Sequence, residues 1–404
     1  MTTSEVDPPV PPAAPRQPVP LWLLALFTLS GPIAMHMLVP ALPHAARDLN
    51  ASVGAMQLTI SLYILGMALG QLGYGPLSDR FGRRPVLTTG LVLYTVAGLA
   101  AALVPNVQAL VSARLFQALG GGAGLALSRA IVRDTAGPAD VARRLALMNL
   151  MVTLGPGLAP VIGGVLAASF GWRTIFIALG TLGLLNLMLL WRLLPETREI
   201  TGTVSAATIA KDYRELLRSP SFIGYAIGGG CATTSMYAFV GAAPFILVDE
   251  LHRPSYEVGL YLGLLVAGFS IGTILATRLI PGVAIGKLLA RSSLVSALAA
   301  FFFLGATLSS HLNVALAVIP MIVFTIGAGI SSPTALSQAL GINPRIIGSA
   351  SGLYGCAQMG IGALCAGLVG IGRDPALAAG IVLASASLIG QLAFWIAARK
   401  RPAT

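Results

Sequence analysis

Two ionisable side chains lie deep inside long apolar runs of this 404-residue chain, where a charge is costly. His36 and Arg114 each sit about seven residues from the end of a run, or roughly 10 Å deep along a helix. A charged group at that depth normally faces a cavity or a partner, so we expect both to surround one central cavity. Gln117, one helical turn beyond Arg114, should face the same space.

The chemistry open to these groups is the binding of a substrate and the movement of a proton. Histidine changes its charge near neutral pH, so His36 is the candidate for a group that takes up and releases a proton. All 14 acidic residues fall in tails, loops or span ends, so the cavity should be neutral to positive and favour neutral or anionic compounds over cations. Two other interpretations remain open: Arg114 could extend its long side chain to the membrane interface, and His36 could be a polar wall without a coupling role.

A second group of candidates lies in the short charged segment 75–85, GPLSDRFGRRP, between two apolar runs. Two glycines there permit a tight turn and close helix contact, and an aspartate could meet arginines and helix N-termini. Membrane topology alone needs neither the acid nor the glycines, so the segment predicts a cytoplasmic gate rather than only a solvated loop. The gating candidates are Gly75, Asp79, Arg80, Gly82 and Arg83, with Arg133 and Asp134 from the end of a later run.

Twelve apolar runs must position these groups, and each is long enough to cross a bilayer as a helix. Hydrophobic residues make up 56% of the chain and charged residues only 10%, whereas soluble domains carry about 25% charge. The mean hydropathy is +0.84. We therefore predict an all-α polytopic membrane protein with these spans: 21–43, 54–74, 86–104, 108–132, 145–168, 173–194, 221–248, 256–279, 284–308, 313–340, 346–370 and 376–398.

The longest polar interval, 195–220, divides the chain into two halves of six spans each. Its KDYRELLR stretch has apolar residues at Tyr213, Leu216 and Leu217, which predicts a short amphipathic helix on the membrane surface. The Pro-rich start of the chain predicts a disordered tail. The expected organisation is a cytoplasmic tail at 1–20, helix bundles at 21–194 and 221–398 joined by a cytoplasmic linker at 195–220, and a second tail at 399–404.

The net charge of +11 follows the topology of the chain. Of the 25 Lys and Arg residues, 20 fall on one side of the membrane in this arrangement. Only Arg47, Arg173, Arg253 and Arg373 fall on the other side, and Arg114 lies within a span. This is the positive-inside bias, so we expect both termini in the cytoplasm and no role for nucleic acid.

Several segments resemble the motifs of a known transporter family. Segment 75–84 resembles the loop between spans 2 and 3 of the major facilitator superfamily, and 110–122 resembles its span 4 motif. Segment 155–164 resembles the span 5 motif of proton-driven antiporters. Together with the runs SRAIVRD, FGWR and LPET, these features resemble the Bcr/CflA branch, the bicyclomycin and chloramphenicol exporters.

The resemblance implies the major facilitator fold of two six-helix bundles (6+6), alternating access, and export of drugs or metabolites in exchange for protons. It also implies that Asp79 latches the two halves when the cavity faces outward. The chain departs from its relatives in span 1: they usually read Asp-Met-Tyr-Leu-Pro, whereas residues 36–40 here read His-Met-Leu-Val-Pro. His36 therefore stands where the family has an acid.

The span 5 motif predicts a bent helix in close contact with span 8, since prolines kink helices and glycines permit close approach. A bent packing helix without any coupling role is the alternative. The motif residues are Gly155, Pro156, Pro160, Gly163 and Gly164.

Other polar and aromatic residues could complete a promiscuous, largely apolar cavity wall, although packing is the favoured interpretation for each of them. The candidates are Tyr63, Gln71, Met236, Tyr237, Phe239, Thr334 and Gln338.

We therefore expect a monomeric exporter of small organic compounds in a bacterial inner membrane, with the proton as coupling ion and no other cofactor. The alternative is a specific uniporter or proton symporter of an organic anion or amphiphilic metabolite. A receptor is disfavoured because the chain has no sizeable soluble domain. The sequence shows no metal cluster, nucleophile elbow or phosphate-binding loop, so we do not expect an enzyme, and Cys231, Cys356 and Cys365 should be core residues.

Overall fold

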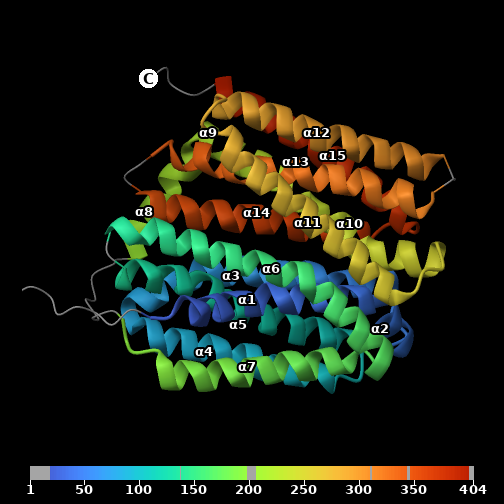
Figure 1. Ribbon diagram of the computed structural model, residues 1–404, viewed down its shortest axis with the longest axis horizontal. Helices are drawn as coiled ribbons and strands as arrows, with labels where there is room; N and C mark the ends of the chain where they lie inside the picture. Colours follow the sequence, from blue (N-terminus) through green and yellow to red (C-terminus); the bar gives the residue numbers. More distant parts are fainter. Residues whose placement is uncertain (1–18, 137, 198–205, 310–311, 344–345, 400–404) are drawn as a thin grey trace, which may run out of the picture.

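The computed structural model describes residues 19–136, 138–197, 206–309, 312–343 and 346–399, which form helices joined by short turns (Figure 1). Most of the first predicted tail (1–18), the last five residues (400–404) and part of the predicted linker (198–205) lie outside the described residues.

The first half of the chain forms one group of helices, which fills the lower part of Figure 1. Its elements are α1 (Leu21–Leu38), the short 3-10 helix η1 (Val39–Ala41), α2 (Leu42–Asp48), α3 (Val53–Phe81), α4 (Arg83–Ala102), α5 (Val107–Thr135), α6 (Pro138–Phe170) and α7 (Arg173–Leu193).

The second half forms the upper group in Figure 1, preceded by the linker helix α8 (Ala206–Arg218). Its first span is a broken helix made of α9 (Pro220–Thr233), η2 (Thr234–Met236), α10 (Tyr237–Pro244) and the π-helical η3 (Phe245–Glu250). The remaining helices are α11 (Ser255–Leu279), α12 (Ile285–Leu308), α13 (Val314–Leu340), α14 (Ile347–Val369) and α15 (Pro375–Arg399).

Most of these helices are long enough to cross a bilayer. Within the described residues, eleven helical segments have sufficient length and hydropathy, and the Gly155–Phe170 part of α6 is a shorter apolar stretch. Large apolar side chains such as Leu298 and Phe302 lie on the outer surface, at 63% and 60% exposure, as expected for contact with lipid. The order of the helices follows the twelve predicted spans.

Polar side chains begin several of the helices. Each accepts a hydrogen bond from a backbone N–H in the first turn and satisfies a donor that the helix itself cannot pair. The residues that do so are Ser52 before α3, Asn106 before α5, Ser219 before α9 and Asn313 before α13.

The charged segment 75–85 is not the loop that the sequence predicted. Helix α3 continues to Phe81 and α4 begins at Arg83, because a helix already formed adds one backbone hydrogen bond per residue through polar residues as well. Only Gly82 interrupts the helices, with φ +92°, a backbone conformation that favours glycine. The prediction of a turn at Gly75 is wrong: it lies inside α3, and a Cβ there would meet nothing within 4 Å.

The two halves pack together along α3 with α14 and along α6 with α11. This packing is tightest at the end of the molecule that carries α2, which we call the far end; the end that carries α8 is the linker end. At the far end, a Cβ on Gly54 would clash with the carbonyl oxygen of Gly370, so the two backbones touch. Nearby, a Cβ on Gly259 of α11 would lie 2.5 Å from the carbonyl oxygen of Pro160 in α6.

Candidate functional site

A central cavity of about 340 Å³ lies between the two halves. Helix α1 contributes Met35 and His36, α3 contributes Met67, and the second half contributes Tyr237 and Met359. Further polar side chains on the wall are Gln71, Arg129, Tyr354 and Gln358. The wall thus combines rings and thioethers with a few polar groups, as ligand sites for small organic molecules do.

A second cavity of about 490 Å³, the vestibule, lies at the linker end. It shares Gln71, Arg129 and Ser351 with the central cavity, so the two spaces adjoin. Since the far end is closed by backbone contact, the path to the central cavity runs from the linker end. The vestibule is also lined by Gly75, Asp79, Arg83, Arg133, Asp134, Asp212 and Tyr213.

The structure brings two of the predicted wall residues together. The rings of His36 and Tyr237 lie 6.3 Å apart between centroids, tilted by 42°, and both line the central cavity. His36 is only 6% exposed, and no described carboxylate forms an ion pair with it. Because α1 and α10 belong to opposite halves, this contact depends on how the two halves sit.

Arg114 does not face the central cavity, which corrects the prediction that it lies there beside His36. Its guanidinium is fully buried inside the first half and lies 3.8 Å from the ring centroid of Tyr63. Nη1 donates to the carbonyl oxygen of Ala34 at 3.0 Å and to Oε1 of Gln117 at 2.8 Å. An aromatic ring and two oxygen acceptors offset part of the cost of burying this charge, while Nε and Nη2 are buried with no hydrogen-bond partner among the described residues.

Several other predicted wall residues also point into the protein, because neighbouring helices cover the faces that carry them. Gln117 is fully buried beside Arg114, and the hydroxyl of Tyr63 donates to the carbonyl oxygen of Gly31 at 2.9 Å. Phe239 packs edge-on against Phe303, with centroids 5.4 Å apart. Met236, Thr334 and Gln338 are likewise absent from the residues described as lining the central cavity.

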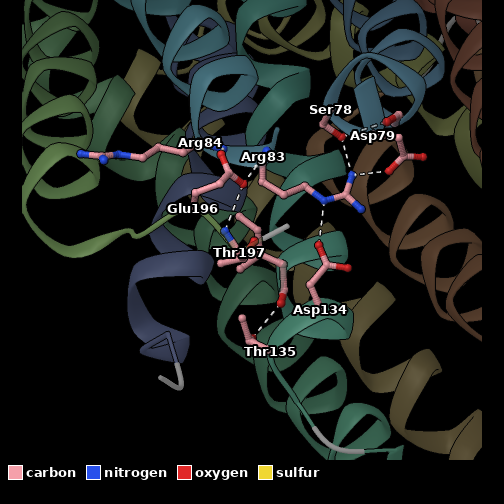
Figure 2. Close-up of polar contacts among 10 residues, drawn as sticks. Ser78, Asp79, Arg83, Arg84, Asp134, Thr135, Glu196 and Thr197 are labelled. Carbon is pink, nitrogen blue, oxygen red and sulfur yellow. Dashed lines mark hydrogen bonds and ion pairs between the residues drawn. The ribbon is translucent and has the colours of Figure 1, made fainter. Parts of the chain in front are cut away.

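Three of the predicted gating residues, Asp79, Arg83 and Asp134, form an ion-pair cluster at the linker end (Figure 2). Arg83 is 5% exposed and joins two acids: Nη1 lies 2.8 Å from Asp79 Oδ1, and Nε lies 2.8 Å from Asp134 Oδ2. Arg83 therefore ties the end of α3 to the end of α5 within the first half. Arg133 is exposed and lines the vestibule, whereas Arg80 lies over the ring of Phe81 at 5.2 Å.

Glu196 completes this cluster from a distant part of the chain (Figure 2). Its carboxylate accepts hydrogen bonds from the backbone N–H groups of Arg83 at 2.9 Å and Arg84 at 3.1 Å. Helix α4 starts after Gly82, which has no side chain to cap it, so Glu196 supplies an anion at the positive end of the helix. The sequence alone does not predict this role of Glu196, because nothing local in the LPET run pairs it with the start of α4.

The antiporter-motif segment lies in close contact with span 8, as predicted, but not through its own glycines at 155 and 163. Cβ atoms on Gly155 and Gly163 would clash with Leu29 and Met37 of α1, so these glycines serve contact with span 1 rather than span 8. The close approach to span 8 uses Gly259 from that span. Pro156 lines the central cavity, Gly164 is buried, and α6 continues through both Pro156 and Pro160.

The predicted amphipathic linker helix is present as α8, but it docks on the second half. Asp212 accepts a hydrogen bond from Ser349 at 2.9 Å, and Glu215 accepts one from Asn343 at 2.7 Å. Leu216 is 2% exposed, whereas Leu217 is 55% exposed. Burial raises the pKa of the Tyr213 hydroxyl above its ordinary value, so this group lines the vestibule as a neutral phenol.

Arg129 is the principal wall residue that sequence reasoning missed. It is exposed to the space between the halves and lines both cavities. A signal was available, because Arg129 falls inside the predicted span 108–132 and lies one turn before Arg133 on the same face.

Comparison with known proteins agrees with this architecture. The sequence family described as Major Facilitator Superfamily matches residues 24–367. The uncharacterized MFS-type transporter YdgK of Bacillus subtilis is 31% identical over 94% of this chain and 95% of its own length. Multidrug resistance protein D of Escherichia coli is 30% identical over 84% of this chain and 85% of its own length.

Further similarities point the same way. A bicyclomycin resistance protein homolog of Haemophilus influenzae is 27% identical over 86% of this chain and 87% of its own length. Among solved structures, a D-xylose-proton symporter superposes with a TM-score of 0.72 at 18% identity, covering 92% of this chain and 96% of the other. A bacterial homologue of the lysosomal transporter Spinster superposes with a TM-score of 0.73 at 17% identity. This match covers 95% of this chain and 98% of the other.

Proposed function

Because this chain belongs to the major facilitator superfamily, we propose that it exports small organic compounds by alternating access, in exchange for protons. Its fold is that of the family, and the resemblance to the bicyclomycin and multidrug exporters is confirmed by the relatives that carry those names. It is a transporter and not an enzyme.

The observation that carries the proposal is the central cavity between the two halves. Its walls come from both halves, so any relative movement of the halves reshapes it. Close backbone contact at the far end and a vestibule at the linker end match one end state of an alternating-access cycle. The opposite state would open the contact between Gly54 and Gly370.

His36 is the group that we assign to proton coupling. It lies on the cavity wall, beside Tyr237, where a ligand and a proton can compete for the same space. Imidazole changes its charge near neutral pH, so a change of water access between the two states can load and release a proton.

We propose that the protein lies in the inner membrane of a bacterium with its linker end in the cytoplasm. We also propose that it acts as a monomer. The distribution of Lys and Arg supports this orientation. Reporter fusions after Glu196 and after Arg399 should both report the cytoplasm. An external signal at either site would refute the orientation.

A specific transporter of an organic anion, working as a uniporter or proton symporter, is the second candidate. It is favoured by the lack of any acidic side chain among the described residues that line the central cavity. A cationic substrate would find no opposite charge on this wall.

Transport by purified protein in liposomes tests both candidates. A proton gradient should drive accumulation of a fluorescent amphiphilic compound, and addition of the compound should release protons in the opposite direction. Movement of substrate and protons in the same direction would favour the symporter, and substrate movement without protons would favour the uniporter.

A further inference from the structure

We propose that Arg129 is the residue that recognises substrate in the central cavity, and that the substrates are amphiphilic organic anions such as aryl carboxylates. This inference rests on the proposed function, in which the central cavity is the transport site. It narrows the substrate class and assigns the recognition to one side chain.

Arg129 is the only permanently charged residue among the described residues that line the central cavity, since His36 is charged only when it is protonated. Its side chain is exposed, and within the described part of the chain it forms no hydrogen bond or ion pair. An arginine in the interior of a membrane protein is costly unless its charge is used. Arg114 differs, because its guanidinium is fully buried against the ring of Tyr63 and its Nη1 donates to Ala34 and Gln117, so no ligand in the cavity reaches it.

The acids of the vestibule are engaged with other partners. Asp79 and Asp134 both pair with Arg83, and Asp212 accepts a hydrogen bond from Ser349. The positive charge of Arg129 is therefore available to a ligand that carries a carboxylate, sulfonate or phosphate. A guanidinium can bind such a group through two parallel N–H donors.

The position of Arg129 along α5 suits an entry path from the linker end. The face of α5 toward the two cavities carries Leu125, Ala126, Arg129, Ala130 and Arg133, spaced by helical turns. Arg133 lines only the vestibule, whereas Arg129 lies about 6 Å deeper, at the junction with the central cavity.

The rest of the central cavity suits an apolar or aromatic body. Met35, Met67 and Met359 line it together with the rings of His36 and Tyr237. Thioethers and rings adapt to varied apolar shapes, so the anionic group would fix the orientation while the body varies. A ligand about the size of an aryl alkanoate fits a cavity of this volume.

The test is a binding experiment on the purified full-length protein. The probes are a panel of aryl carboxylates such as 4-phenylbutyrate, each with its methyl ester and its matched primary amine, ranked by thermal shift and then titrated. The unaltered protein should prefer the acids. Arg129→Gln should weaken binding of the acids by about tenfold or more and leave the esters unchanged, since a hydrogen bond to a charged group is lost.

Two further variants separate the effect of the charge at position 129 from a general effect of removing an arginine. Arg129→Lys should recover part of the preference for acids, because it restores the charge but not the two parallel donors. Arg291→Gln removes an exposed arginine on α12 that does not line either cavity, and it should bind like the unaltered protein. A preference for esters or amines, no binding of any acid, or equal binding of acids by Arg129→Gln would each overturn the proposal.

The binding result is separate from the transport result. If the acids bind through Arg129 but no probe crosses the liposome membrane, the assignment of Arg129 stands and the proposed export function fails. If probes are exported with protons while acids and esters bind alike, export stands and the assignment of Arg129 fails.

Discussion

The imidazole of His36 on α1 and the phenol ring of Tyr237 on α10 lie next to each other across the boundary between the halves, with centroids 6.3 Å apart. Since the two rings belong to different halves, their contact changes whenever the halves move. A proton or a ligand at His36 can therefore favour one arrangement of the halves over the other, which is the physical requirement for coupled transport.

His36→Gln should retain ligand binding and lose proton-driven accumulation, because glutamine keeps a polar side chain but cannot carry a proton. Proton flux in liposomes, measured with substrate on one side only, gives the answer. His44→Gln is the matched control, because His44 is an exposed histidine of α2. If His36→Gln still moves protons and substrate in the same ratio as the unaltered protein, another group couples the two movements.

Arg114→Ala should lower the thermal stability of the purified protein. It removes a guanidinium stacked on Tyr63 and its two hydrogen bonds, each worth about 1.5–3 kcal/mol for a charged donor before desolvation is counted. Arg114→Met fills the same space without a charge and should restore most of the stability, because buried charges replaced by apolar side chains often cost little.

The methionine variant also separates two roles of Arg114. A stable Arg114→Met protein with normal transport would make the residue purely structural. A stable protein without transport would show that the charge itself takes part in the cycle.

Asp79→Asn should slow transport while ligand affinity stays nearly unchanged. It removes one of the two carboxylates that hold Arg83, so the vestibule changes while the central cavity does not. Asp140→Asn, an exposed acid at the start of α6, serves as the control. Altered affinity with normal turnover would contradict a gating role for Asp79.

Gly54→Leu should prevent closure of the far end, because even a Cβ at this position clashes with the carbonyl oxygen of Gly370. Transport should be lost in a folded protein. Gly305→Leu adds the same bulk on α12 where a Cβ meets nothing within 4 Å, and it should remain active.

Closure of the far end is measured by how fast a cysteine in the central cavity is labelled. This cysteine replaces Gln358 of the cavity wall, in a protein whose three native cysteines are replaced. In Gly54→Leu, a membrane-impermeant maleimide added at the far end should label this cysteine faster than in the protein with glycine at 54. Equal labelling would mean that contact between the Gly54 and Gly370 backbones does not close the far end.

Features that depend on residues close together in the chain could be predicted from the sequence. The order of the spans, the two halves and the linker helix follow from hydrophobic runs and polar intervals. The family resemblance follows from short motifs. Even there, the polar end of α3 was predicted as a loop, because hydropathy marks where a helix meets lipid and not where it stops.

The sequence by itself determined that His36 and Arg114 lie at membrane depth, since depth depends only on position along a span. Which side chains meet was decided by the tertiary structure. The guanidinium of Arg114 lies against Tyr63 within its own half, whereas Arg129 lines the central cavity. Glu196 caps the start of α4 although it lies beyond α7 in the chain. The direction in which a helix face points depends on contacts with helices far away in the chain, and a single sequence does not record those contacts locally.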